Sequence, residues 1–250
     1  LDYYRIDIED AIGTPGHDVI YQQCLDSRFN SLVGSAPGSV TGEQMAANNP
    51  FCALIQREYV AGSTNLYGAD RKFKAQYMNQ GGIRSRGYDL QLDWGAALAD
   101  VGLESLPGRI DANVVYSKLE EYSVSGFPGA PYIDYTGTIT DAAFDYRLFS
   151  TLGWSSGPMS VGLRWQHLPS LDPAPGSAGS VYGVDSHDQF DLFGRWTLSN
   201  RYELRAGIDN LFDADPEVVG ASVSNNALGS TLAEYDAFGR RFYIGVKVSF

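Results

Sequence analysis

Large apolar side chains alternate with small or polar ones through most of this chain. In the closing stretch, 241–250, the apolar positions are Phe242, Ile244, Val246, Val248 and Phe250. Alternation with period two is typical of a β-strand, because successive side chains point to opposite faces. Eight stretches carry this pattern, and we predict a strand for each: 2–10, about 71–97, 109–119, 143–154, 159–168, 188–198, 202–209 and 241–250.

The connections between these strands alternate in length. Long segments follow the first, third, fifth and seventh strands, at about 11–70, 125–141, 169–187 and 211–239. Short segments follow the second, fourth and sixth strands, at 99–108, 155–158 and 199–201. Long loops at one rim and tight turns at the other are typical of an antiparallel up-and-down β-barrel in an outer membrane. No run of about 18 apolar residues offers a transmembrane helix, but a transmembrane strand needs only about ten residues.

All four tryptophans fall on the apolar side of their strands. Trp94, Trp154 and Trp196 lie near the short turns, and Trp165 lies near the opposite rim. Aromatic girdles at the two lipid–water boundaries of a membrane barrel have this arrangement. The alternative is that the four are core residues of a β-sandwich.

The other side of the strands carries many charges, which we expect to face a water-filled interior. We place Tyr4, Ile6 and Ile8 of the first strand, and Phe144 of the fourth, on the apolar side. A basic side chain at the middle of a lipid-facing surface would cost about 2–4 kcal/mol. The charged residues on the polar side are Arg5, Asp7, Glu9, Asp89, Asp93, Asp111, Asp145, Arg147, Arg164, Asp191, Arg195, Glu203, Arg205, Asp209 and Lys247.

These charges favour a barrel wider than eight strands. Side chains just fill the interior of an eight-stranded barrel, whereas this chain must also house many inward charges and a long first loop. The strand pattern begins at the first residue, without an initiator Met or a signal peptide. We therefore expect a mature or truncated piece of a longer protein, whose eight strands are cut from a wider barrel.

The composition is typical of an all-β chain and argues against one class of binding partner. The chain contains 16 Tyr, 12 Phe and 28 Gly against 3 Met, which suits strands and turns. Its 30 Asp and Glu against 18 Lys and Arg give a net charge of −12, which argues against a nucleic-acid partner.

Catalytic and metal-binding patterns do not stand out in the chain. The histidines His17, His167 and His187 have no ligand spacing, so we expect no enzyme, no cofactor and no metal site. The loop acids are candidate calcium ligands, although scattered carboxylates are usually only solvated. They are Asp18, Asp26, Glu43, Asp172 and Asp185.

The two cysteines, Cys24 and Cys52, lie 28 residues apart in the first long segment. They form no CxxC motif and have no histidine cluster beside them, which argues against zinc. A disulfide formed in an oxidising compartment is the favoured interpretation, and two free thiols are the alternative. In the entropy model such a bridge stabilises the fold by roughly 3–4 kcal/mol.

Four stretches, in this order, carry a family likeness: YYRIDIEDAI (3–12), NQGGIRSRGYDLQLDW (79–94), IDNLFDADP (208–216) and GRRFYIGVKVSF (239–250). Together they resemble the C-terminal part of TonB-dependent outer-membrane receptors, 22-stranded barrels with an N-terminal plug. The likeness covers essentially all 250 residues. It implies the last eight strands of such a barrel, with the plug absent, in the outer membrane of a Gram-negative bacterium.

The resemblance also implies partners. Outer-membrane lipid would cover the apolar side, and TonB would act through the missing plug. The chain end looks like the signal that the barrel-assembly machinery reads, carried here by Gly245, Val248 and Phe250. Recognition of that signal by strand addition to an exposed sheet edge is the expected mode.

By this resemblance, the chain is part of a receptor for energy-coupled uptake of a scarce ligand, namely a siderophore, cobalamin or an oligosaccharide. Long loops on rigid scaffolds usually carry recognition, so candidate ligand contacts lie in the loop 11–70 and on the polar wall. The loop candidates are Tyr21, Phe29, Phe51, Tyr59 and Tyr67. The wall candidates are Arg147, Arg164, Arg195 and Arg205.

Two alternatives remain open. One is a complete small eight-stranded outer-membrane barrel that serves as a passive pore or an adhesion module. The other is a secreted β-sandwich that binds carbohydrate. We also expect a chain of eight strands made alone to aggregate, because it would leave two unpaired sheet edges.

Overall fold

The computed structural model describes residues 1–28, 30–36, 38–56, 72–73, 77–79, 81–126, 129–177, 179, 182–218 and 234–249. The chain divides into two compact units. The sheet unit contains Leu1–Ile6, Arg84–Ser123 and Asp134–Phe250, and the loop unit contains Asp7–Ile83 and Val124–Ile133.

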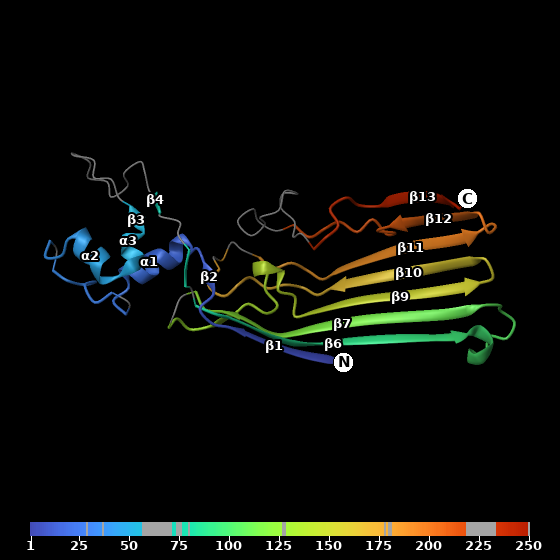
Figure 1. Ribbon diagram of the computed structural model, residues 1–250, viewed down its shortest axis with the longest axis horizontal. Helices are drawn as coiled ribbons and strands as arrows, with labels where there is room; N and C mark the ends of the chain where they lie inside the picture. The colour runs from blue at the N-terminus through green and yellow to red at the C-terminus, as the bar shows by residue number, and fades with distance from the viewer. Residues whose placement is uncertain are drawn as a thin grey trace. The chain divides into compact units, whose positions relative to one another are not determined.

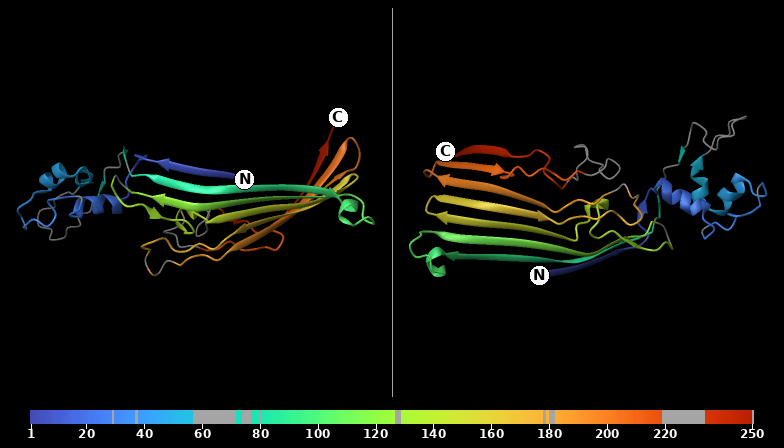
Figure 2. Two further views of the ribbon diagram at one scale, coloured as in Figure 1. Left: turned by 90° about the horizontal axis from the view of Figure 1, so that it is seen from below. Right: turned by 180° about the vertical axis from the view of Figure 1, so that it is seen from behind.

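The sheet unit is a meander of long strands (Figure 1). Its strands are β1 (Asp2–Ile8), β6 (Ile83–Ala97), β7 (Arg109–Val124), β9 (Tyr146–Ser156), β10 (Met159–Leu168), β11 (His187–Thr197), β12 (Tyr202–Asp209) and β13 (Arg241–Val248). They lie side by side in that order, with the short β8 (Ile133–Asp134) beside β7, and every pair of described register from β7 to β13 is antiparallel. Figure 2 shows the sheet as open and curved. The predicted eight strands in up-and-down order are confirmed.

The alternation of loop lengths is confirmed as well. Strands β9 and β10 are joined by Gly157 and Pro158 alone, with Ser156 paired to Met159 and Gly157 at a positive φ of 53°. The β6–β7 connection holds a short 3-10 helix, η1 (Leu98–Val101). The long connections leave from the opposite end of the strands (Figure 1).

Two strands begin later than predicted. The second starts at Ile83 rather than near residue 71, because Gly82 exchanges backbone hydrogen bonds with Ser125 before the strand begins. The fourth starts at Tyr146 rather than at 143. Asp141 and Ala142, in η2 (Thr140–Ala142), have positive φ values of 54° and 47°, which turns the chain away from the sheet.

Cross-strand register separates a polar face from an apolar face. Direct partners in an antiparallel pair share a face. Polar-face pairs run from β7 to β13: Ser117 with Arg147, Thr151 with Arg164, Ser160 with Arg195, Arg195 with Arg205, and Glu203 with Lys247. The apolar face carries Leu152, Leu163, Leu192, Ile208 and Phe242 across the same strands. Its side chains are uncovered, with Phe242 72% and Ile244 76% exposed.

Aromatic rings on the polar face break the strict alternation. The ring of Phe193 covers Gly162, and the ring of Tyr243 covers Gly207. Our placement of Tyr4 on the apolar side is wrong, because a β-carbon on Gly87 would lie 2.7 Å from the Tyr4 hydroxyl oxygen. Ile6 and Ile8 alternate with Tyr4 along β1 and share its face, so the predicted polar and apolar sides of this strand are exchanged. Gly87 shares its face with Asp89, two residues on. In each case a ring fills the gap that a glycine leaves on the neighbouring strand.

The placement of Phe144 on the apolar side is also wrong. Phe144 precedes β9 and is 3% exposed, in a core made by the long connections. The other members of this core are Ile139, Ala142, Leu168, Leu171, Val184 and Tyr235. A bulky apolar residue therefore serves the packing of the loops here, rather than the lipid-facing side of a strand.

Two of the tryptophans lie at opposite ends of their strands, each with a polar partner. Trp154, at the short-turn end, donates its indole N–H to the Pro107 carbonyl oxygen at 3.2 Å. Trp165, at the long-loop end, donates to Asp188 Oδ1 at 2.7 Å and stacks on Phe190 with ring centroids 6.0 Å apart. Each ring therefore has an apolar body and a polar partner at a rim, as interfacial tryptophans do.

The NLFD stretch ends β12 in a tight turn. Asn210 has a positive φ of 52° and is 1% exposed. Its side-chain oxygen accepts from the Ala214 N–H at 2.8 Å, and its side-chain nitrogen donates to the Ala214 carbonyl oxygen at 2.9 Å. Its own backbone N–H donates to Asp191 Oδ1 at 2.9 Å. Asn tolerates this left-handed conformation better than most residues, which accounts for its place in the motif.

The loop unit is partly helical, although we predict only a long loop for 11–70. It contains α1 (His17–Leu25), α2 (Gly42–Asn48) and α3 (Pro50–Ala53). Two short strand pairs accompany them, β2 (Ile12–Gly13) with β5 (Met78–Asn79), and β3 (Ile55–Gln56) with β4 (Lys72–Phe73). Thr41 and Gln44 form a capping box at the start of α2, a signal readable in the sequence.

A disulfide between Cys24 and Cys52 joins α1 to α3, so the predicted bridge is confirmed. Asn30, 0% exposed, lies beside it. The Asn30 amide nitrogen donates to the Cys24 carbonyl oxygen at 2.9 Å, and its oxygen accepts from Asn48 Nδ2 at 2.8 Å. Ile20, Phe51 and Leu54 form the apolar core of the unit. Among the described residues, no helix has the length and apolar content needed to cross a membrane.

Candidate ligand-binding site

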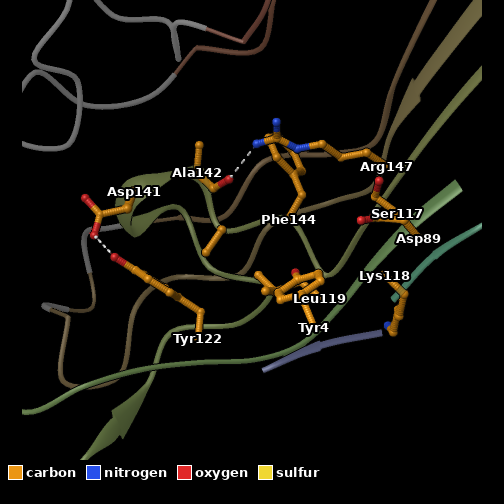
Figure 3. Close-up of a pocket in the computed structure, with 11 residues that line it drawn as sticks. Tyr4, Asp89, Ser117, Lys118, Leu119, Tyr122, Asp141, Ala142, Phe144 and Arg147 are labelled. Atoms are coloured by element: carbon orange, nitrogen blue, oxygen red, sulfur yellow. Dashed lines mark hydrogen bonds between the residues drawn. The ribbon is translucent and has the colours of Figure 1, made fainter. Parts of the chain in front are cut away.

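A cavity of about 490 Å³ lies in the sheet unit, where the strands meet the long connections (Figure 3). Strands β1, β6, β7 and β9 form its wall, and the segment before β9 closes it. Its lining residues are Tyr4, Asp89, Ser117, Lys118, Leu119, Tyr122, Asp141, Ala142, Ala143, Phe144 and Arg147. We call this cavity the rim pocket.

Two side chains from the wall hold the turn that closes the rim pocket. The Tyr122 hydroxyl donates to Asp141 Oδ2 at 3.1 Å, and Arg147 Nη2 donates to the Ala142 carbonyl oxygen at 3.4 Å (Figure 3). Both turn residues have left-handed backbones, which strain a residue with a β-carbon. The turn therefore depends on groups that themselves line the pocket.

The long connections pack together behind this turn. Tyr235 meets Phe144 edge-on at 6.4 Å and His187 at 5.0 Å between ring centroids. Backbone hydrogen bonds join Ile139 to Asp172 at 3.0 Å and Leu171 to Val184 at 2.8 and 3.0 Å. The wall of the rim pocket is thus backed by a small apolar core rather than by separate loops.

Arg147 is the cation best placed to meet a ligand in the rim pocket. Its guanidinium lies over the Phe144 ring at 5.1 Å, and no carboxylate among the described residues forms an ion pair with it. By contrast, Lys118 Nζ lies 2.9 Å from Asp145 Oδ2. An exposed guanidinium in a pocket that Tyr4 and Tyr122 also line suits a ligand with anionic or hydroxyl groups on an aromatic or sugar ring.

The other three arginines predicted as ligand contacts also lie on the polar face, nearer to the short turns. Arg164 pairs with Thr151 in β9, and Arg195 and Arg205 face each other further along. Arg164 lies between the rings of Phe149 and Phe193, 5.6 Å from each centroid, with Asp191 Oδ2 at 3.5 Å. Arg164 is therefore already engaged, and Arg147 lies apart from the other three.

The aromatic residues that we predict as ligand contacts in the loop unit differ in their exposure to solvent. Phe51 is 8% exposed in the core of the unit, which leaves little of its ring for a ligand to contact. Tyr21 is half-buried on α1. Phe29, Tyr59 and Tyr67 lie outside the described residues, as does Phe250 of the C-terminal signal. Gly245 and Val248 lie on β13, and their role as a signal stays a prediction.

The loop unit has a cavity of its own, of about 710 Å³, beside the disulfide. Both cysteines line it, together with Leu25, Thr41, Gly42, Glu43, Met45, Ala46, Ala53 and Ile55. Since Cys24 and Cys52 join two of its walls, the shape of this cavity depends on the bridge.

The loop acids suggested as calcium ligands form no metal-binding cluster in the described residues. No three His, Cys, Asp or Glu side chains in the described part of the chain are placed to hold a metal ion. Hydrogen bonds from Arg28 lower the pKa of Asp26 to about 2. His167 Nδ1 lies 2.9 Å from Asp188 Oδ1, and His187 is buried against Tyr235.

Several residues of the site escape sequence reasoning. Tyr122, Asp141 and Ala142 carry no motif, because their role arises from a turn whose backbone a sequence does not reveal. Phe149 and Phe193 are readable in principle, because they fall on the polar parity of strands whose other members are charged. An aromatic residue at a polar position of a strand is therefore the sequence signal that could have identified both phenylalanines.

Comparison with known proteins places the chain in a family. A family model described as TonB dependent receptor-like, beta-barrel, matches residues 1–211. No curated protein sequence matches the chain.

Solved structures of the ferric enterobactin receptor PfeA from Pseudomonas aeruginosa resemble the fold. A mutant in complex with enterobactin aligns over 99% of this chain and 28% of its own, at 16% identity and a TM-score of 0.54. A double mutant of PfeA aligns over 75% of this chain and 25% of its own, at 19% identity and a TM-score of 0.50.

The meander, its two faces and the family match define part of a β-barrel of the outer-membrane receptor type. The chain belongs to the TonB-dependent receptor β-barrel family. It spans about a quarter of the length of the receptors whose structures it resembles.

Proposed function

We propose that this chain forms part of an outer-membrane receptor that takes up a scarce small-molecule ligand in an energy-coupled step. Membership of the TonB-dependent receptor family is the observation that carries the proposal. The two-faced meander supports it, because an uncovered apolar face suits lipid and a charged face suits a watery interior. TonB, acting through a plug, and the barrel-assembly machinery are the partners that this proposal entails.

The rim pocket is the proposed ligand contact of the sheet unit. It lies at the long-loop end, which is the outer end in barrels of this kind. Arg147 supplies a cation without an ion-pair partner in the described residues, and Tyr4 and Tyr122 supply ring faces and hydroxyls. A siderophore with acidic oxygens is the first candidate ligand, because the similar receptor PfeA is recorded with enterobactin. Cobalamin and oligosaccharides remain the other candidates.

The test measures binding and uptake by the full receptor chain that contains these residues. The probes are ferric enterobactin, cobalamin and a neutral oligosaccharide such as maltoheptaose. We expect the receptor to take up one of the three probes, and we expect this uptake to stop when the proton gradient is collapsed. For an anionic probe, Arg147→Gln should weaken binding about tenfold, because a charge-assisted hydrogen bond is lost.

The matched control is Arg109→Gln, at the opposite end of the polar face, where the arginine already pairs with Asp111 at 2.7 Å. Binding in this variant should match the unaltered receptor. Passage of all three probes regardless of the proton gradient would identify a passive pore and overturn the proposal.

A further inference from the structure

The short-turn end of the polar face carries a row of positive charge. The register connects Arg109 in β7 to Ser155 in β9, Ser160 in β10, Arg195 in β11, and Arg205 in β12. Gly245 in β13 completes the row, and Lys247 lies two residues further along β13, opposite Glu203. Two serines separate Arg109 from Arg195 in this row, whereas Arg195 and Arg205 are direct neighbours.

The carboxylates near this row are fewer than the cations. Arg109 Nε lies 2.7 Å from Asp111 Oδ1, and Arg205 Nη2 lies 2.6 Å from Glu203 Oε1. Arg195 forms no ion pair with any described residue. Glu203, already held by Arg205, is also the direct cross-strand partner of Lys247. Arg205 and Lys247 therefore share the charge of Glu203, and Arg195 has no ion-pair partner in the described part of the chain.

Arg195 and Arg205 lie directly opposite each other on neighbouring strands. Like charges in that position repel, because directly opposed residues have β-carbons about 4.5–5.5 Å apart. Glu203 offsets the charge of Arg205, and water or a further anion would screen the remaining charge of Arg195. A carboxylate or phosphate of a ligand would supply such screening, because an arginine guanidinium binds either group through two parallel hydrogen bonds.

The row is distinct from the rim pocket. Arg147 and Ser155, the member of the row in β9, are eight residues apart on that strand, or roughly 26 Å at 3.3 Å per residue. A small molecule held by Arg147 does not reach Arg195.

We propose that Arg195 and Arg205, supported by Lys247, form an oxyanion-binding site on the polar face near the short-turn rim. The site takes a carboxylate or phosphate group of a small anionic ligand, and the Ser155 and Ser160 hydroxyls border it. This proposal rests on the proposed function in one respect, namely that the polar face lines the interior of a barrel. A ligand released from the rim pocket would then bind next at this oxyanion site.

The experiment measures equilibrium binding of two probes, citrate and inorganic pyrophosphate, to the full receptor chain in detergent micelles by calorimetry. We expect Arg195→Gln to weaken binding of at least one probe about tenfold. Glu203→Gln should tighten it, because the competing carboxylate is removed. Arg195→Lys should bind with intermediate affinity, because it keeps the charge and loses the fork.

The matched control is Arg241→Gln, on the same face. Arg241 already meets Asp236 at 2.7 Å and Asp209 at 3.8 Å, so its removal should leave probe binding unchanged. Equal loss in Arg195→Gln and Arg241→Gln would show general attraction by positive charge and overturn the proposal. Unchanged binding in Arg195→Gln would overturn it as well.

The two probes separate the sources of the oxyanion, since preference for citrate indicates carboxylates and preference for pyrophosphate indicates phosphates. The outcome is independent of uptake. A receptor that transports nothing but binds a probe through Arg195 would refute the proposed function and leave this site standing. Heat-modifiable migration on gels, compared among the variants, confirms that each barrel is folded.

Discussion

The ring of Phe193 lies over Gly162, its direct partner on β10, where a β-carbon would overlap the ring. The same ring faces Arg164 at 5.6 Å. The glycine therefore sets the position of an aromatic ring, and the ring in turn sets the position of a wall arginine.

Gly162→Ala should destabilise the sheet by about 1–3 kcal/mol, because the ring must leave its rotamer or the strands must separate. Urea unfolding of the receptor in lipid vesicles, followed by tryptophan fluorescence, measures the change. Gly153→Ala is the matched control, since Gly153 is the direct partner of Gly162 on β9 and its nearest neighbour atom lies 3.8 Å from the added β-carbon. An equal loss in both variants would contradict the role of the ring.

The two faces of β13 should meet different surroundings. Val246 pairs with Leu204 on the apolar face, and Lys247 pairs with Glu203 on the polar face. With cysteine at each position in turn, a charged water-soluble thiol reagent should label position 247 and spare position 246 in intact outer membranes. The native cysteines are joined in a disulfide and do not interfere. Equal labelling would overturn the assignment of the faces.

The turn that closes the rim pocket should respond to Asp141. Asp141→Ala removes the acceptor of the Tyr122 hydroxyl and leaves an alanine at a φ of 54°. We expect a loss of about 1–3 kcal/mol in local stability, measured by hydrogen exchange of 137–145. Asp141→Asn should change little, because Asn tolerates the left-handed region and keeps an acceptor oxygen. Equal protection in the two variants would show that the backbone strain has no consequence.

The phenol of Tyr235 should lose its proton only at unusually high pH. Burial in the core of the long connections raises the pKa of Tyr235 to about 12. Because the folded pKa exceeds the unfolded value of about 10, the core is stabilised at lower pH and loses that stabilisation as the pH rises through about 10 to 12. The absorbance difference at 295 nm between the receptor and its Tyr235→Phe variant should show no phenolate from this residue at pH 10.5. A transition near pH 10 would contradict its burial.

The sequence predicts the strands well because the alternation is a local property of each one. The positions of Arg164, Arg195 and Arg205 on a common face follow from the same period. The misplacement of Tyr4 and Phe144 has another origin. Each is apolar at the expected parity, but Tyr4 covers a glycine on the next strand and Phe144 packs against other loops. Long-range packing of that kind leaves no trace in the spacing along one segment.

The loop unit should depend on its disulfide. Cys24→Ser with Cys52→Ser removes the link between α1 and α3, which should destabilise the unit by roughly 3–4 kcal/mol in the entropy model. It also leaves Asn30 buried beside the former bridge, without its contact to Cys52 Sγ at 3.2 Å. We expect trypsin to cut after Arg28 much faster in the double variant, while the sheet unit keeps its resistance. Addition of a reductant to the unaltered receptor is the matched test, since it should raise cleavage after Arg28 to the same rate. Unchanged cleavage under both conditions would mean that packing of Ile20, Phe51 and Leu54 holds the helices together without the bridge.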